Sequence, residues 1–211
     1  MLYNLIDEDS FSEYIVRPNL FGCNIINKKN KSKSKEPDNA AIIGICKISD
    51  IKVLVIILNK AYKLGTMGVF EGEKITLAFE YATKKRIPVL SITASGGVRV
   101  QEGIPALMQM VKTVNALKKH SKKGLLYISI ITDPTLGGVS ASFVSLADII
   151  IAEQGAIYGF SGKRIINETT YEKISDDFQT SEFAKKHGMV DIVGNKKNIK
   201  EIVVSILKLH R

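Results

Sequence analysis

The chain has 211 residues, of which 45% are hydrophobic and 24% charged, so its composition is that of a globular protein and excludes disordered and fibrous classes. Its two cysteines, Cys23 and Cys46, are too few for a disulfide framework or a four-cysteine zinc site. No apolar run reaches the roughly 18–20 residues that a membrane-spanning helix needs. The net charge of +9 favours anionic partners, but no aromatic residues alternate with the lysines to stack on bases, so nucleic acid is not supported.

The first predicted element is an irregular N-terminal segment over residues 1–37, which ends in a polar, lysine-rich linker. Its acidic start has no signal-peptide pattern, so we expect a soluble, cytoplasmic protein. One domain is expected over residues 38–211. Its predicted strands cover 40–48, 52–58, 88–92, 125–132 and 148–152, and its predicted helices cover 73–86, 101–120, 139–147, 180–187 and 197–209, with a short strand between the last two helices.

Strand, glycine loop and helix recur along the chain, which predicts an α/β fold of units joined by right-handed crossovers. In the helix predicted over 101–120, six apolar residues share one side, and we expect this side, including Met108, in the core. The six residues are Ile104, Leu107, Met108, Val111, Val114 and Leu117.

Two loops carry the chemical argument: residues 93–99, TASGGVR, and residues 133–139, DPTLGGV. Each follows a buried strand and precedes a helix, where unpaired backbone N–H groups can hold an oxyanion. Paired glycines also let the backbone approach a ligand closely, although they are equally compatible with simple turns. Two such loops on neighbouring strands could direct two amides at one carbonyl oxygen and stabilise its enolate. No nucleotide-phosphate motif of the P-loop or Rossmann type is present.

Four segments, residues 72–76, 94–113, 127–166 and 178–191, resemble the carboxyltransferase beta subunit of bacterial-type acetyl-CoA carboxylase, a member of the crotonase-like superfamily. They keep the family's order and spacing, and the resemblance covers residues 40–209. It implies a single domain built as a stack of ββα superhelical turns. It also implies an enzyme that transfers the carboxyl group of carboxybiotin to acetyl-CoA, giving malonyl-CoA for fatty acid synthesis.

The resemblance implies that backbone amides of the two glycine loops stabilise the thioester enolate. The candidates are Gly96, Gly97, Val98, Gly137 and Gly138, and we favour Gly97 and Gly138 as the donors. It further implies a site shared with an alpha subunit, in a complex of two alpha and two beta subunits. The cofactor, biotin, is expected on a separate biotin carboxyl carrier protein that a biotin carboxylase serves. No zinc or other metal is expected, because the chain cannot form the four-cysteine zinc ribbon of many beta subunits.

Five further residues are candidates for binding coenzyme A. Arg99 is expected either to neutralise a ligand phosphate or to anchor its loop through Glu102. Lys163 and Arg164 could contact the CoA phosphates or simply lie on the surface, and Lys163 replaces a proline of the family. Gly65 and Gly68 belong to the segment YKLGTMG, which has one glycine fewer than the family's FMGGSMG.

Three other functions remain open. A specialised homologue would carboxylate or decarboxylate a carrier-bound acyl group. A Clp-like serine peptidase would use Ser140 or Ser142, but no histidine lies between His120 and His187 to serve as its base. A non-catalytic binding module would use the basic surface to hold nucleic acid, with an affinity that falls steeply with salt.

Overall fold

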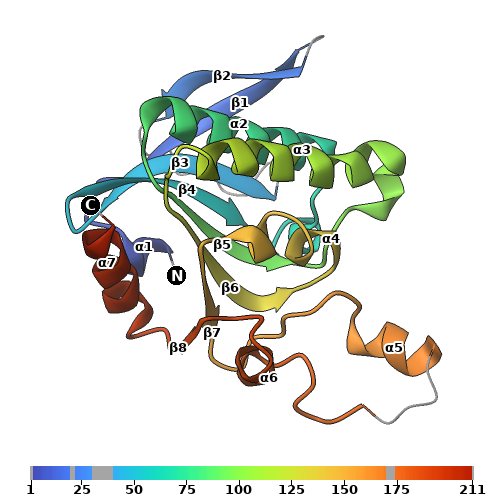
Figure 1. Ribbon diagram of the computed structural model, residues 1–211. Coiled ribbons are helices and arrows are strands. Elements are labelled where there is room, and N and C mark those ends of the chain that lie inside the picture. Colours follow the sequence, from blue (N-terminus) through green and yellow to red (C-terminus); the bar gives the residue numbers. More distant parts are fainter. Residues whose placement is uncertain (1, 20–21, 30–39, 170–173, 211) are drawn as a thin grey trace.

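The computed structural model describes residues 2–19, 22–29, 40–169 and 174–210, which form one mixed eight-stranded sheet covered by helices (Figure 1). The strand order is β2-β1-β3-β4-β5-β6-β7-β8. Pairing is antiparallel from β2 to β4 and parallel from β4 to β8. The strands are β1 Ser12–Asn19, β2 Gly22–Lys29, β3 Ala41–Ile48, β4 Ile51–Leu58, β5 Val89–Ser95, β6 Tyr127–Thr135, β7 Ile149–Glu153 and β8 Ile192–Gly194.

Helices cover both faces of the sheet, with α2 and α3 on one face and α1 and α7 on the other (Figure 1). The helices are α1 Leu2–Leu5, α2 Val69–Lys85, α3 Ile104–Ser121, α4 Gly137–Ser140, α5 Lys163–Thr169, α6 Ser181–Lys186 and α7 Ile199–Leu209. Three short 3₁₀ turns are η1 Lys63–Gly65, η2 Val100–Glu102 and η3 Val144–Leu146. None of the helices in the described ranges has the length and apolar character needed to cross a membrane.

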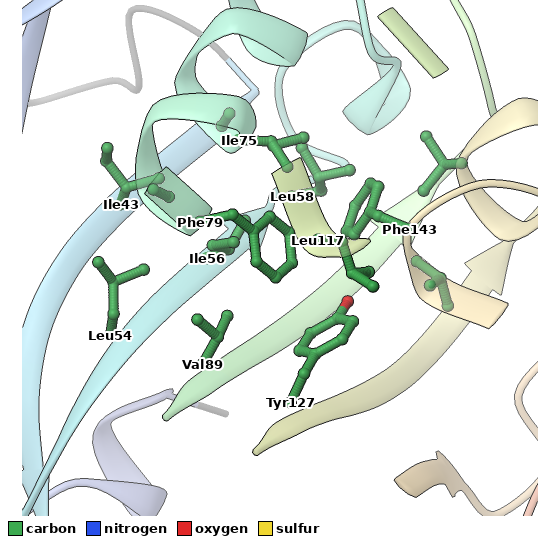
Figure 2. Close-up of a cluster of buried hydrophobic side chains, with 14 of the residues drawn as sticks. Ile43, Leu54, Ile56, Leu58, Ile75, Phe79, Val89, Leu117, Tyr127 and Phe143 are labelled. Atoms are coloured by element: carbon green, nitrogen blue, oxygen red, sulfur yellow. The ribbon is translucent and has the colours of Figure 1, made fainter. Parts of the chain in front are cut away.

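Strand β4 shows why the central strands are apolar along their whole length. Leu54 and Ile56 point to the α2 side, where they pack in a cluster with Phe79 (Figure 2). Val53 and Val55 belong to the cluster on the other face, which α1 and α7 cover. A strand buried on both faces needs apolar residues at every position, which explains the run VLVIIL over residues 53–58.

The prediction for the N-terminal segment is wrong where the structure describes it. Residues 12–19 and 22–29 form the hairpin β1–β2 rather than irregular chain, and β1 extends the main sheet by pairing with β3. The carboxylate of Asp7 also accepts hydrogen bonds from the Ser49 and Asp50 amides, at 3.0 and 2.9 Å. A polar hairpin at the edge of a sheet lacks the continuous run of apolar residues that marks a buried strand. For this reason the hydrophobic pattern of the sequence does not predict β1 and β2. Residues 30–39 of the linker lie outside the described ranges, and the domain boundary after residue 37 stays a prediction.

The predicted core face of α3 is wrong for four of its six residues, whereas Leu117 is buried as predicted and Val114 is partly buried. Met108 is 50% exposed, and its neighbours Ile104, Leu107 and Val111 are exposed as well. The face that packs on α2 carries smaller and polar residues, including Ala106, Gln109, Thr113 and Ala116. The helices approach closely at Gly72, where an added Cβ would lie 2.4 Å from the Cβ of Gln109. Close helix packing therefore selects small residues for the buried side, and the larger apolar residues face outward.

His120, at the end of α3, is fully buried between the two helices and the sheet. Its Nδ1 lies 3.0 Å from the Thr83 hydroxyl. Burial lowers the pKa of its imidazole, and this outweighs the opposite effects of the Leu126 carbonyl and Asp148.

We expect the free energy of unfolding to fall as the pH drops below the ordinary histidine pKa of about 6.5. The unfolded chain binds a proton there that the folded chain binds only at lower pH, so acid favours unfolding. Urea unfolding at pH 7.5 and pH 5.5 should show this loss in the parent chain and a smaller one in His120→Gln. The exposed His187 provides the matched control, and an equal pH dependence in His120→Gln and His187→Gln would contradict the assignment.

Candidate functional site

The two glycine loops, predicted separately from the sequence, lie against each other at the carboxyl ends of β5 and β6. A Cβ added to Gly97 would lie 3.1 Å from the Cα of Gly137, and the reverse distance is also 3.1 Å. Both residues have positive φ angles, +111° and +62°, which side-chain-bearing residues rarely adopt. Glycine at both positions therefore allows the two backbones to meet.

Three of the five candidate amides already have acceptors within the chain. Gly96 donates to the Leu64 carbonyl at 2.9 Å, and Gly137 donates to the Phe160 carbonyl at 2.8 Å. The Gly97 amide donates to the Ser95 hydroxyl oxygen at 3.1 Å. The preference for Gly97 as the donor to substrate is therefore corrected, because the Gly97 amide already donates its hydrogen bond to the side chain of Ser95, two residues earlier.

The amides of Val98 and Gly138 donate no hydrogen bond to any described residue. The same is true of Val139, but Val139 is fully buried, whereas Val98 and Gly138 are half-buried. Val98 and Gly138 are thus one free donor from each loop, which is the arrangement that an oxyanion requires.

Gly138 lies directly against its counterpart in the first loop. An added Cβ would lie 2.4 Å from Cγ2 of Val98 and 2.7 Å from Sδ of Met110. No larger residue fits at this position without moving the Val98 side chain. Gly96 differs, since the nearest atom to an added Cβ there is 3.7 Å away.

Arg99 anchors the first loop to α2 instead of facing a ligand. The residue is 8% exposed, and its guanidinium forms ion pairs with Glu71 at 2.9 Å and Glu102 at 2.6 Å. It also donates to the Thr66 carbonyl and hydroxyl, at 2.9 and 3.2 Å. Burial alone would lower the pKa of Arg99, but the two carboxylates raise it. The contact with Glu102 confirms the anchoring alternative, and the ligand-phosphate role is corrected because the charge is already neutralised.

The two carboxylates of this network hold the start of α2. Glu102 accepts a hydrogen bond from the Val69 amide at 2.7 Å, and Glu71 accepts one from the Gly68 amide at 3.0 Å. Burial alone would raise the pKa of Glu102, but the Val69 amide and Arg99 together lower it. The network therefore joins α2 to the turn that follows the first glycine loop.

Gly65 and Gly68 bring the segment 62–68 against the first loop. Gly65 has φ +65°, and an added Cβ would lie 2.0 Å from the Ala94 carbonyl oxygen. A Cβ on Gly68 would lie 2.4 Å from Nη1 of Arg99. Both glycines thus have a packing role, while their contact with coenzyme A stays a prediction.

Lys163 and Arg164 begin α5. The Lys163 ammonium donates to the Asp176 carbonyl at 2.7 Å, so it ties this helix to a later loop. The side chain of Arg164 lies outside the described part of the structure. Contact of either residue with the CoA phosphates stays a prediction.

The serine peptidase arrangement does not form among the described residues. Ser140 is buried, and its hydroxyl donates to the carbonyls of Gly137 and Gly159 at 2.7 and 2.6 Å. Ser142 is buried and donates to the Val139 carbonyl at 3.3 Å. Neither hydroxyl contacts a histidine, so neither is activated as a nucleophile.

Exposed apolar residues flank the glycine loops on both sides. The first set, called here the α3 face, includes Val100 at 79% and Ile104 at 73% exposure, and its members are Leu64, Val100, Ile104, Leu107, Met108 and Val111. The second set, called here the second apolar patch, comprises Phe160 and Met189, which line one pocket together with Ser140 and Ala141. Large exposed apolar surfaces of this kind mark interaction sites.

Within the described ranges, histidine, cysteine and carboxylate side chains do not gather in groups of three that could hold a metal ion.

Comparison with known proteins gives consistent matches over nearly the whole chain. The carboxyl transferase domain family matches residues 2–208. The chain is 44% identical over 210 residues to acetyl-coenzyme A carboxylase carboxyl transferase subunit beta 1 of Lachnospira eligens, covering 97% of this chain and 81% of that protein. It is 45% identical over 214 residues to acetyl-coenzyme A carboxylase carboxyl transferase subunits beta/alpha of Clostridium tetani. That match covers 98% of this chain but only 37% of the relative.

Among solved structures, the transcarboxylase 12S hexamer with bound methylmalonyl-coenzyme A superimposes with a TM-score of 0.80 and 27% identity. The match covers 99% of this chain and 40% of that one. This likeness confirms the predicted crotonase-like α/β fold.

Proposed function

Since this chain belongs to the carboxyl transferase domain family, we propose that it is the beta-type subunit of an acetyl-CoA carboxylase. It would transfer a carboxyl group from carboxybiotin to acetyl-CoA and so form malonyl-CoA for fatty acid synthesis. The observation that carries the proposal is the pair of unpartnered amides, Val98 and Gly138, on two glycine loops in contact.

The chain's part in this reaction is electrostatic. Removing a proton from the methyl group of acetyl-CoA moves negative charge onto the thioester oxygen, and two fixed N–H donors stabilise that charge. The Val98 and Gly138 amides fit this task, because they are held by loops that are themselves fixed by backbone and ion-pair contacts. Biotin, carried by a separate protein, would supply the carboxyl group and the base that takes up the methyl proton.

The two apolar surfaces support an alpha subunit as the partner. The α3 face begins at Val100, directly after the first glycine loop, and Phe160 of the second patch accepts the hydrogen bond of Gly137. A partner that covered both surfaces would enclose the free amides and exclude water from them. The Clostridium tetani relative carries beta and alpha parts in its name as one protein, which agrees with such a pairing.

Reconstitution tests the proposed function directly. The chain, an alpha subunit and a carboxylated biotin carrier protein are mixed with acetyl-CoA, and malonyl-CoA is measured. We expect product only when both subunits are present, and no product in the full mixture would overturn the proposal. Turnover of a carrier-bound acyl group but not of acetyl-CoA would indicate the specialised homologue. Sedimentation of the same mixture tests the expected complex of two alpha and two beta subunits.

The double variant Leu107→Asp, Val111→Asp should weaken binding of the alpha subunit at least about 100-fold. Both side chains are exposed on the α3 face, so the variant should still fold. Binding of the alpha subunit would bury the two new carboxylates in the interface, which costs binding free energy. Titration calorimetry would measure the affinity. Leu209→Asp, the same change at an 87% exposed leucine at the end of α7, which covers the other face of the sheet, is the matched control. Equal affinities for the double variant and the parent chain would exclude the α3 face from the interface.

A further inference from the structure

Ser95 holds the two glycine loops together. It is the last residue of β5, and it is fully buried. Its hydroxyl oxygen accepts the hydrogen bond of the Gly97 amide at 3.1 Å. Its backbone carbonyl accepts a hydrogen bond at 2.9 Å from the amide of Leu136, which directly precedes the glycine pair of the second loop. One residue therefore fixes both loops, the first through its side chain and the second through its main chain.

The peptide units on both sides of Gly97 are held by hydrogen bonds. The unit before Gly97 is held by its N–H group, which donates to the Ser95 hydroxyl. The unit after Gly97 is held by its carbonyl oxygen, which accepts from the Met67 amide at 2.9 Å and lies 3.5 Å from the Ser95 hydroxyl. Because a peptide unit is planar and trans, the Val98 N–H points opposite to this carbonyl. The Val98 amide is thus directed away from both Met67 and Ser95.

Gly97 depends on these contacts because glycine does not restrict its own backbone angles. Its φ of +111° is one of many conformations that glycine can adopt, so neighbouring groups must select it. The Gly97 amide is buried, and without the Ser95 hydroxyl it would have no acceptor, which costs free energy. Rotation of the peptide unit towards the open side of the loop would relieve this cost. Such a rotation changes the φ of Gly97 and with it the position of the Val98 amide.

We propose that Ser95 is a positioning residue for the Val98 amide. Its hydroxyl holds the Gly97 amide away from the substrate and so leaves Val98 as the donor of the first loop. The inference rests on the proposed function, because the choice of amide matters only if the loops stabilise an oxyanion. Ser95 does not act on the substrate itself, since it is fully buried and its hydroxyl already has the Gly97 amide as donor.

Ser95→Ala in the reconstituted complex should lower kcat for malonyl-CoA formation about 10- to 100-fold, because a displaced donor stabilises the enolate less. The KM for acetyl-CoA should stay within about twofold, since the lost stabilisation is confined to the transition state. Ser91→Ala is the matched control, because it removes another fully buried serine hydroxyl from β5, one bonded to the hydroxyls of Tyr127 and Ser129 at 2.9 and 3.0 Å. It should be about as stable to urea as Ser95→Ala but keep the parent kcat. Equal kcat values for the two variants would overturn the inference.

Ser95→Cys is a second variant for the same assay. Its thiol is close to the hydroxyl in size but is a weaker hydrogen-bond acceptor. We therefore expect its kcat to lie between the values for the parent chain and for Ser95→Ala. A kcat below that of Ser95→Ala would show that the size of the side chain, rather than its acceptor, controls the loop, and this would also overturn the inference.

The infrared band of the thioester carbonyl separates this inference from the proposed function, because it needs no turnover. Acetyl-CoA labelled with a heavy isotope at the carbonyl carbon is bound to the complex of this chain and the alpha subunit, without biotin carrier. In the parent complex we expect the band at lower frequency than in solution, because two N–H donors polarise the carbonyl. The shift should be smaller in Ser95→Ala and unchanged in Ser91→Ala. An equal shift in all three proteins would reject the role of Ser95 and leave the proposed function intact, whereas an unshifted band in the parent complex would reject the amide pair and this inference with it.

Discussion

Replacing Gly138 by alanine should lower kcat of the reconstituted enzyme at least about 100-fold, and valine should abolish turnover. The new Cβ would lie 2.4 Å from Cγ2 of Val98, so the second loop or the Val98 side chain must move. Either movement would displace a free amide from the position at which we propose that it meets the thioester oxygen. Loss of one oxyanion donor typically costs 100- to 1000-fold in kcat, roughly 2.7–4 kcal/mol. Steady-state kinetics of malonyl-CoA formation would measure the effect.

Gly96→Ala is the matched control for this prediction. It places the same methyl group in the neighbouring loop, where the nearest atom would be 3.7 Å away and the Gly96 amide is already bound to the Leu64 carbonyl. It should keep most of the activity. Near-normal turnover of Gly138→Ala, with unfolding that matches the parent chain, would remove Gly138 from the site. An equally inactive Gly96→Ala would show that the loops tolerate no methyl group, whichever amide is free.

The meeting of the two glycine loops could be predicted from the sequence, but which amide of the first loop lacks a hydrogen-bond partner could not. Two glycine pairs after buried strands are a local pattern, and parallel neighbouring strands bring such loops together. Whether an amide is free depends on what else reaches it. The Ser95 hydroxyl occupies the Gly97 amide, and nothing in the sequence TASGGVR distinguishes this from a free Gly97.

The helix and strand pattern was predicted where each element has a face buried within this chain, and it failed for the apolar side of α3, which this chain leaves largely exposed. The apolar side of α3 has ordinary helical spacing, so periodicity alone assigns it to the core. The structure buries the opposite side on α2, because Gly72 allows the two helices to approach there. An apolar periodicity shows which side of a helix is apolar, not that the same chain buries that side.

Arg99→Met should reduce the free energy of unfolding by about 3–5 kcal/mol, because it leaves a buried carboxylate without its counter-charge. Glu71 is 1% exposed and has Arg99 as its ion-pair partner, whereas Glu102 is partly exposed. Methionine has a similar length, so the loss would come mainly from charge and hydrogen bonding rather than from a cavity. Urea denaturation at pH 7 would measure the change.

Lys47→Met provides the control, since it removes an ion pair of the same kind from the surface. The Lys47 ammonium lies 3.7 Å from the Asp50 carboxylate, and both side chains are largely exposed, so the expected loss is below about 1 kcal/mol. Arg99→Met should also lower activity, because the first glycine loop loses its tie to α2 and the Val98 amide is no longer held in place. The double variant Glu71→Gln, Arg99→Met removes the buried charge along with its partner and should recover part of the stability but not the activity. If Arg99→Met were as stable as Lys47→Met, the ion-pair network would not be what fixes the loop.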